Sequence, residues 1–432
     1  MPTRRQPLTR ILLVTGKGGV GKTSVAAATA VRAAMRGGRV LVTSTDPAHS
    51  LADALAQPLT DAPTPVDGSV AGLGGAATSG SSGEPRHATT SSFDGVLLAQ
   101  QIDAQARLER HWGAVRGYLT TVLASGGLDE VRAEELVLLP GLDELFALID
   151  LRHQVDSGRF DVIVVDCAPT AETLRLLALP DALRWYADRL LGAGRRVARL
   201  ARPIRRRTDE PGGMPIPGDD VFDTVEQVHA DLAGVHALLQ DVARTSVRLV
   251  TNPERLAVAE AMRTATSLSL FGYAIDAVIA NRVLPDEVDD AYLGRWKARH
   301  AEHLATLRSA FADLPVLEAP LLQDEPIGIG ALDRLAAAAY GALDATAVLH
   351  SSPPLELVRD GAEHVLRLAL PFASSDDLDI HRRGDELHLK VAGVRRTIAL
   401  PASLQGADVV AAKLHDGALH VRFRAATRSV VS

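Results

Sequence analysis

The sequence predicts an α/β fold in which a mostly parallel sheet is flanked by helices, followed by a small C-terminal antiparallel β-sandwich. Apolar runs of strand length at residues 10–15, 39–43 and 160–165 are separated by helix-forming segments, a pattern typical of parallel sheets. Apolar residues recur every three or four positions over 222–242, which predicts an amphipathic helix. Short segments within 355–427 alternate polar and apolar residues, as antiparallel strands with one buried face do.

A glycine-rich loop follows the first predicted strand. Residues 16–23 have the sequence GKGGVGKT and lead into an alanine-rich helical segment, so the motif G-x-x-x-x-G-K-[ST] has its required strand–loop–helix context. Backbone N–H groups of such a loop surround phosphate oxygens, Lys22 neutralises the β- and γ-phosphates, and the Thr23 hydroxyl holds Mg²⁺. The chain is therefore predicted to be a P-loop NTPase that binds a nucleotide and Mg²⁺. The predicted nucleotide-binding residues of the loop are Gly16, Lys17, Gly18, Gly19, Val20, Gly21, Lys22, Thr23 and Ser24.

Two carboxylates follow predicted buried strands. Asp46 comes after the strand at 39–43, and Asp166 directly follows the strand at 160–165. Ligands of open α/β sheets bind at the carboxyl ends of the strands. We expect Asp46 to orient the attacking water, and Asp46 and Asp166 to join Thr23 around Mg²⁺. Capping of the next helix is the alternative role for Asp46, since Pro47 follows it.

Composition limits the class of protein. The 432 residues suffice for two domains, and 47% hydrophobic with 23% charged residues is typical of globular proteins. A net charge of −7 argues against dedicated nucleic-acid binding. One cysteine excludes a disulfide framework. Because neither a signal peptide nor an apolar run of transmembrane length is found, we expect a cytoplasmic protein without a transmembrane segment.

The same patterns predict the domain organisation. Residues 1–348 carry every nucleotide motif and form the predicted ATPase domain, in which 61–92 is a flexible loop rich in Gly, Ser and Thr and about 184–245 is a helical insertion. An arginine run at 184–207 is either a solvated helix face or a contact for an acidic partner or an anionic membrane surface. Residues 355–427 form the β-sandwich, which we expect to be separable from catalysis.

Four separated motifs resemble the family of arsenical-pump (ArsA) and tail-anchored-protein-targeting ATPases over residues 10 to about 345. These are the loop with its extra Lys17, the sequence DPAHS that begins at Asp46, the strand that ends at Asp166, and Asn281. The resemblance implies a homodimer in which Lys17 reaches the partner's nucleotide; a solvated surface lysine is the alternative.

Further site residues are implied by the same resemblance. Asn281 corresponds to the residue that recognises adenine, and Pro320 and Leu321 belong to the loop that covers the base. Asn252, at the end of the preceding strand, is instead expected to cap the helix that Pro253 opens.

The chain also departs from the family pattern. The family's second switch is usually D-T-A-P-T-G-H-T, whereas this chain has Cys167, Ala171 and Glu172 at three of those positions. These changes leave open how tightly the γ-phosphate drives the switch. The segment 355–427 resembles the small-heat-shock (α-crystallin-like) module found at the C-terminus of some bacterial members.

The leading functional hypothesis is a Mg²⁺-dependent ATP hydrolase that couples opening and closing of a homodimer to the handling of a client, in protein targeting or a chaperone-like role. An arsenite- or anion-pump ATPase subunit is one alternative, although trivalent arsenic needs several thiolates and the chain has only Cys167. A partition- or septum-type ATPase switch is another, but the membrane-binding members end in a basic amphipathic helix, whereas this chain is predicted to end in strands. The iron–sulfur relatives need cysteines that the chain lacks.

Overall fold

The computed structural model describes residues 8–45, 50–67, 94–102, 142–167, 219–361 and 363–424. They belong to two compact units. The first unit combines Met1–Gln101, Gly158–Thr170 and Leu239–Ser432, and the second combines Ile102–Ser157 with Ala171–Leu238.

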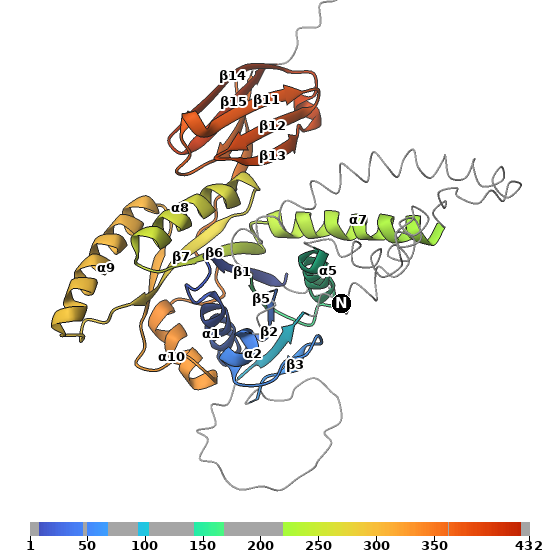
Figure 1. Ribbon diagram of the computed structural model, residues 1–432. Helices are drawn as coiled ribbons and strands as arrows, with labels where there is room; N and C mark the ends of the chain where they lie inside the picture. The colour runs from blue at the N-terminus through green and yellow to red at the C-terminus, as the bar shows by residue number, and fades with distance from the viewer. Residues whose placement is uncertain are drawn as a thin grey trace, which may run out of the picture. The chain divides into compact units, whose positions relative to one another are not determined.

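The first unit is built on a large sheet (Figure 1). Within the described ranges it has eight strands, in the order β3-β4-β2-β5-β1-β6-β7-β8. All neighbouring strands are parallel except β3 and β4, which confirms the mostly parallel sheet. The central strands are buried on both faces, which explains their continuous apolar sequences. The strands are β1 (Arg10–Gly16), β2 (Arg39–Ser44), β3 (Thr64–Pro65), β4 (Val96–Gln101), β5 (Val162–Asp166), β6 (Thr245–Thr251), β7 (Ile275–Val283) and β8 (Val316–Pro320).

Helices α1 and α10 lie side by side and pack on one face of this sheet (Figure 1). The alanine-rich α1 lets its backbone approach the strands closely, and its buried residues share one apolar core with Leu12 and Val14 of β1 and with Leu332 of α10. The helices of this unit are α1 (Lys22–Met35), α2 (Ser50–Leu55), α8 (Arg255–Leu270), α9 (Ala291–Ala310) and α10 (Ile329–Tyr340).

Two local expectations are wrong. Residues 61–67 are not an unpacked loop, because β3 pairs with β4 and Val66, only 1% exposed, donates its N–H to the Leu97 carbonyl. Backbone pairing and one apolar side chain anchor this segment; the rest of the predicted loop lies outside the described residues. Asn252 does not cap α8, since the helix begins two residues later than Pro253 and Glu254 occupies the N-cap position.

The described residues of the second unit lie mainly in two long helices, α5 (Leu142–Asp156) and α7 (Asp219–Gln240), and the last two residues of α7 are counted with the first unit. Arg152 of α5 donates to the carbonyl oxygens of Ala230 and Asp231 on α7, at 3.2 and 3.3 Å. Gly234 leaves the space for this guanidinium group. Residues 219–240, which fall within the predicted insertion, are helical, whereas residues 184–218 lie outside the described part.

The C-terminal segment is an antiparallel β-sandwich, as predicted. A four-stranded sheet in the order β14-β15-β10-β9 and a three-stranded sheet in the order β11-β12-β13 contribute side chains to a common apolar core. Its hairpin turns at Asp416 and Gly417, both with positive φ. The strands are β9 (Leu355–Asp360), β10 (Glu363–Ala369), β11 (Leu378–Arg383), β12 (Glu386–Val391), β13 (Val394–Ala399), β14 (Asp408–His415) and β15 (Ala418–Arg424).

The core of the sandwich is completed by α8. Leu270, at the end of that helix, is fully buried and belongs to the same apolar cluster as the sandwich residues. Arg396 donates to the Leu270 carbonyl, and the rings of Phe311 and Phe372 meet edge to face at 5.2 Å. The sandwich thus has an apolar contact with the preceding part of the chain.

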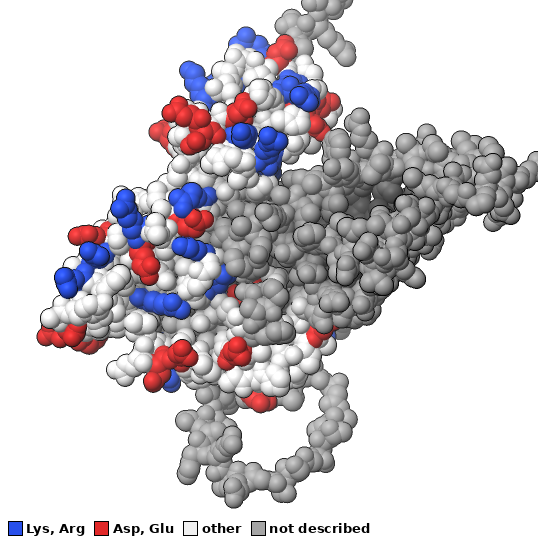
Figure 2. Space-filling model, in the orientation of Figure 1, with Lys and Arg blue, Asp and Glu red and all other residues white. Residues whose placement is uncertain are grey.

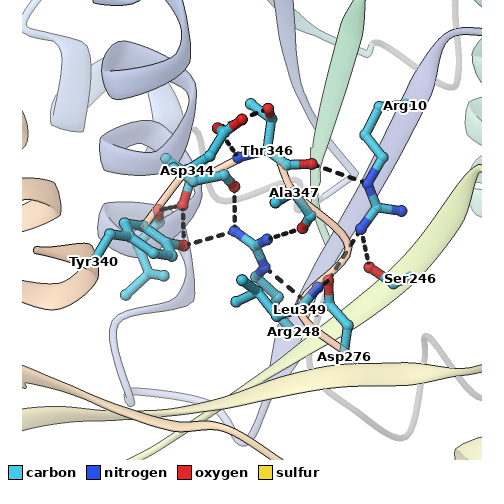
Figure 3. A network of polar contacts seen from close by, with 12 residues as sticks. Arg10, Ser246, Arg248, Asp276, Tyr340, Asp344, Thr346, Ala347 and Leu349 are labelled. Carbon is cyan, nitrogen blue, oxygen red and sulfur yellow. Dashed lines mark hydrogen bonds and ion pairs between the residues drawn. The ribbon is translucent and has the colours of Figure 1, made fainter. Parts of the chain in front are cut away.

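A buried network of charged groups holds the segment that leads to the sandwich (Figure 3). The Asp276 carboxylate of β7 accepts from Arg10 at 3.0 Å and from Arg248 at 3.3 Å. Arg248 also donates to the Tyr340 hydroxyl at 3.0 Å and to the Ala347 carbonyl at 3.1 Å. Burial lowers the pKa of Arg10 to about 10, against the opposing effect of Asp276.

Basic and acidic side chains are interspersed over the described residues on the face shown in Figure 2. None of the helices in the described ranges has both the length and the apolar composition needed to cross a bilayer. The arginine run at 184–207 falls outside these ranges.

Candidate nucleotide-binding site

The predicted phosphate loop connects the carboxyl end of β1, in the middle of the sheet, to the N-terminus of α1. Glycine is required at two of its positions. A Cβ on Gly16 would lie 2.2 Å from the Val250 carbonyl oxygen, and Gly21 has a φ of 87° with the Asn281 amide 2.4 Å from where a Cβ would stand. The helix N-terminus directly after the loop makes this edge of the sheet suited to bind an anion.

The two lysines of the loop have opposite environments. Lys22, in the first turn of α1, is buried and only 6% exposed. Lys17 is exposed, and it makes no hydrogen bond or ion pair with any residue in the described ranges. Lys22 therefore lies within the protein, whereas Lys17 faces solvent.

A carboxylate and two hydroxyl groups meet beside the loop. Asp166 is fully buried at the end of β5, where its Oδ2 accepts from Thr23 Oγ1 at 2.8 Å and from Ser44 Oγ at 3.1 Å. Its backbone carbonyl accepts the Thr45 N–H at 3.0 Å. Hydroxyl and carboxylate oxygens are the ligands that Mg²⁺ prefers, and phosphates and waters complete such sites. Thr23 and Asp166 therefore fit a magnesium ion.

Cys167, next to Asp166, is a poor candidate for thiolate chemistry. Its side chain is 5% exposed, and burial, with a further contribution from the Asp166 charge, raises the pKa of the thiol to about 12. The thiol is therefore neutral at physiological pH.

Asn281 contacts the loop directly. Its Nδ2 donates to the Val20 carbonyl at 2.8 Å, and its side chain is buried. The next residue, Arg282, has a φ of 57°, and the register between β7 and β8 shifts at this point. The bend places the amide against the loop.

Three more of the predicted residues lie within the described ranges. Pro320 ends β8, and Leu321 donates its N–H to the Val283 carbonyl while its side chain is 45% exposed. Ser24 lies in the first turn of α1. Asp46 falls in the gap between the described residues 45 and 50.

Ser44 is a site residue that the sequence pattern did not identify. It ends β2 in register with both Asp166 on β5 and Gln101 on β4. A polar residue at the end of a buried strand is the sequence signal that could have identified it.

The fold and the site together define a P-loop ATPase. The sheet is parallel around the glycine loop, a buried carboxylate lies beside the loop, and a hydroxyl group follows the loop lysine. The family model for the anion-transporting ATPase matches residues 9–73 and 83–341, and the model for the HSP20-like domain found in ArsA matches residues 361–423. The chain belongs to the ArsA ATPase family and carries a C-terminal HSP20-like module.

The chain is similar to named proteins over most of its length. A putative arsenical pump-driving ATPase of Chlorobaculum tepidum is 35% identical over 415 residues, 96% of each chain. A protein of Aquifex aeolicus with a similar name is 31% identical over 94% of this chain and 97% of its own. The ATPase GET3B of Arabidopsis thaliana is 32% identical over 73% of this chain and 75% of its own.

Proposed function

We propose that this ATPase is Mg²⁺-dependent and works as a homodimer whose opening and closing is coupled to the handling of a client. The difference between the two loop lysines carries the proposal. Lys22 is already buried beside its own loop, whereas Lys17 is exposed and has no partner in the described part of the chain. An exposed cation beside a phosphate site is well suited to stabilise charge on the transferred phosphoryl group of a second copy.

Within one chain, each residue has a separate role. Lys22 neutralises phosphate oxygens, and Thr23 and Asp166 would hold Mg²⁺, which would offset charge on the phosphates. Asp46 orients the attacking water. Asn281, which holds the loop through Val20, also faces the base, with Pro320 and Leu321 covering it.

The client is proposed to be a protein rather than arsenite. Relatives are named both as arsenical pump-driving ATPases and as GET3-type ATPases, so the names alone do not decide between arsenite and a protein as the client. The single cysteine favours the protein client, because its thiol is buried and neutral whereas trivalent arsenic needs several thiolates. No contact among the described residues specifically supports a partition-type switch. The proposal also includes a cytoplasmic location.

Mixed dimers test the dimer mechanism. Lys17→Ala should retain ATP binding and lose most turnover, by about 10³-fold for a cation supplied from outside the site. When Lys17→Ala and Asp46→Asn chains are mixed, one site of each mixed dimer receives both defects and the other neither, so hydrolysis should return.

Lys22→Ala is the matched control, because Lys22 acts on the nucleotide of its own loop. Mixing Lys22→Ala with Asp46→Asn leaves one defect in every site and should restore nothing. If Lys17→Ala behaves like this control, Lys17 acts within its own chain and the dimer mechanism is wrong.

A further inference from the structure

Gln101 ends β4 on the same face of the sheet as the magnesium-binding cluster. It is in register with Ser44 of β2, which is in register with Asp166 of β5. Residues in register on parallel strands share a face, and Ala99 and Leu97, two and four positions earlier on β4, belong to the core beneath α1. Gln101, Ser44 and Asp166 therefore form a row along the carboxyl edge of the sheet. Two strand spacings, roughly 10 Å, separate the backbones of Gln101 and Asp166.

The Gln101 amide is buried and has no hydrogen-bond partner within the described structure. The residue is 7% exposed, and neither Nε2 nor Oε1 has a partner, although the backbone N–H donates to the Thr60 carbonyl. The neighbouring Gln100 points to the opposite face and donates its Nε2 to the Asp61 carbonyl at 2.8 Å. Two adjacent glutamines of one strand thus differ in what their side chains contact.

An unsatisfied amide at this position is costly without a ligand. A buried donor or acceptor left unpaired destabilises the folded state, whereas a leucine of similar size at the same place carries no such cost. A primary amide can donate to a phosphate or water oxygen and accept from a water O–H at the same time. It does so without changing its protonation state.

We propose that Gln101 is a catalytic residue that holds the attacking water against the γ-phosphate, with Oε1 accepting from the water and Nε2 donating to a γ-phosphate oxygen. This assignment rests on the ATP hydrolysis proposed for the site. The water oxygen forms the new bond to the γ-phosphorus as the bond to the bridging oxygen of ADP breaks. The bonding electron pair leaves with ADP, and the water protons are left on the released phosphate and in solvent. Gln101 neither gains nor loses a proton.

Gln101→Leu separates this role from a structural one. Turnover should fall by about 10- to 100-fold, the scale for a misplaced reacting group, while the dissociation constant of ATP changes by less than about threefold. The midpoint of thermal unfolding should stay the same or rise, because an unpaired buried amide is removed. Steady-state hydrolysis, equilibrium binding of ATP and thermal unfolding of the full chain measure the three quantities.

Gln100→Leu is the matched control. It removes the hydrogen bond to the Asp61 carbonyl, so it should lower the thermal midpoint and leave turnover of the folded protein unchanged. Turnover of Gln101→Leu within twofold of the wild type would overturn the assignment. So would a loss of turnover accompanied by the thermal destabilisation seen for the control. Absence of hydrolysis in the wild-type chain would instead overturn the proposed function itself, together with this inference.

Discussion

Replacing Asp276 with asparagine should destabilise the protein by about 3–5 kcal/mol, the cost of removing one partner of a buried ion pair. Asp276 and Arg248 have no exposed side-chain surface, and the side chain of Arg10 is 11% exposed. At N–O distances of 3.0 and 3.3 Å, each attraction is worth roughly 5 kcal/mol with an effective dielectric constant of about 20. Desolvation offsets part of this, but the variant loses the attraction and keeps two buried cations facing each other.

The free energy of unfolding of the wild type and the variant is measured by urea denaturation, with circular dichroism as the signal. Asp333→Asn is the control, because Asp333 pairs with Arg32 at 3.1 Å and both side chains are about a quarter exposed. A pair in that environment is worth about 0–1 kcal/mol. If Asp276→Asn costs less than about 1 kcal/mol, no more than the control, the network does not hold the segment from Tyr340 to Ala347 in place and the reasoning fails.

Three further predictions concern the site and the module. Asp46→Asn should slow turnover by about 10²-fold or more at unchanged ATP affinity, measured by steady-state kinetics; an unchanged kcat would leave Asp46 as a helix cap. Arsenite should not stimulate the ATPase rate, since one buried thiol per chain cannot supply a thiolate site, and strong stimulation that disappears in Cys167→Ser would favour the pump. A chain that ends at residue 348 should still bind ATP in an equilibrium assay but lose about 1.5–3 kcal/mol of stability, because Leu270 becomes exposed; loss of nucleotide binding would place the module in the ATPase core.

Local patterns in the sequence were sufficient to predict the elements that contain the nucleotide-binding residues. The glycine loop, its following helix and the strand that ends at Asp166 depend on residues that are close in sequence, so their spacing predicts them. The β-sandwich was predicted for the same reason, since alternation and an Asp–Gly turn identify a hairpin without knowledge of the rest of the chain.

Only the tertiary structure decided which distant residues meet. Ser44 reaches Asp166, and Gln101 lies beside Ser44, because the sheet places β4, β2 and β5 next to each other although they are far apart in the chain. Asn281 holds the phosphate loop because β7 bends after it. Leu270 completes the core of a module that begins about 85 residues later, a contact between segments whose sequence patterns are independent of each other. Strand order and packing between separate segments set these contacts, and neither leaves a periodic signal in the sequence.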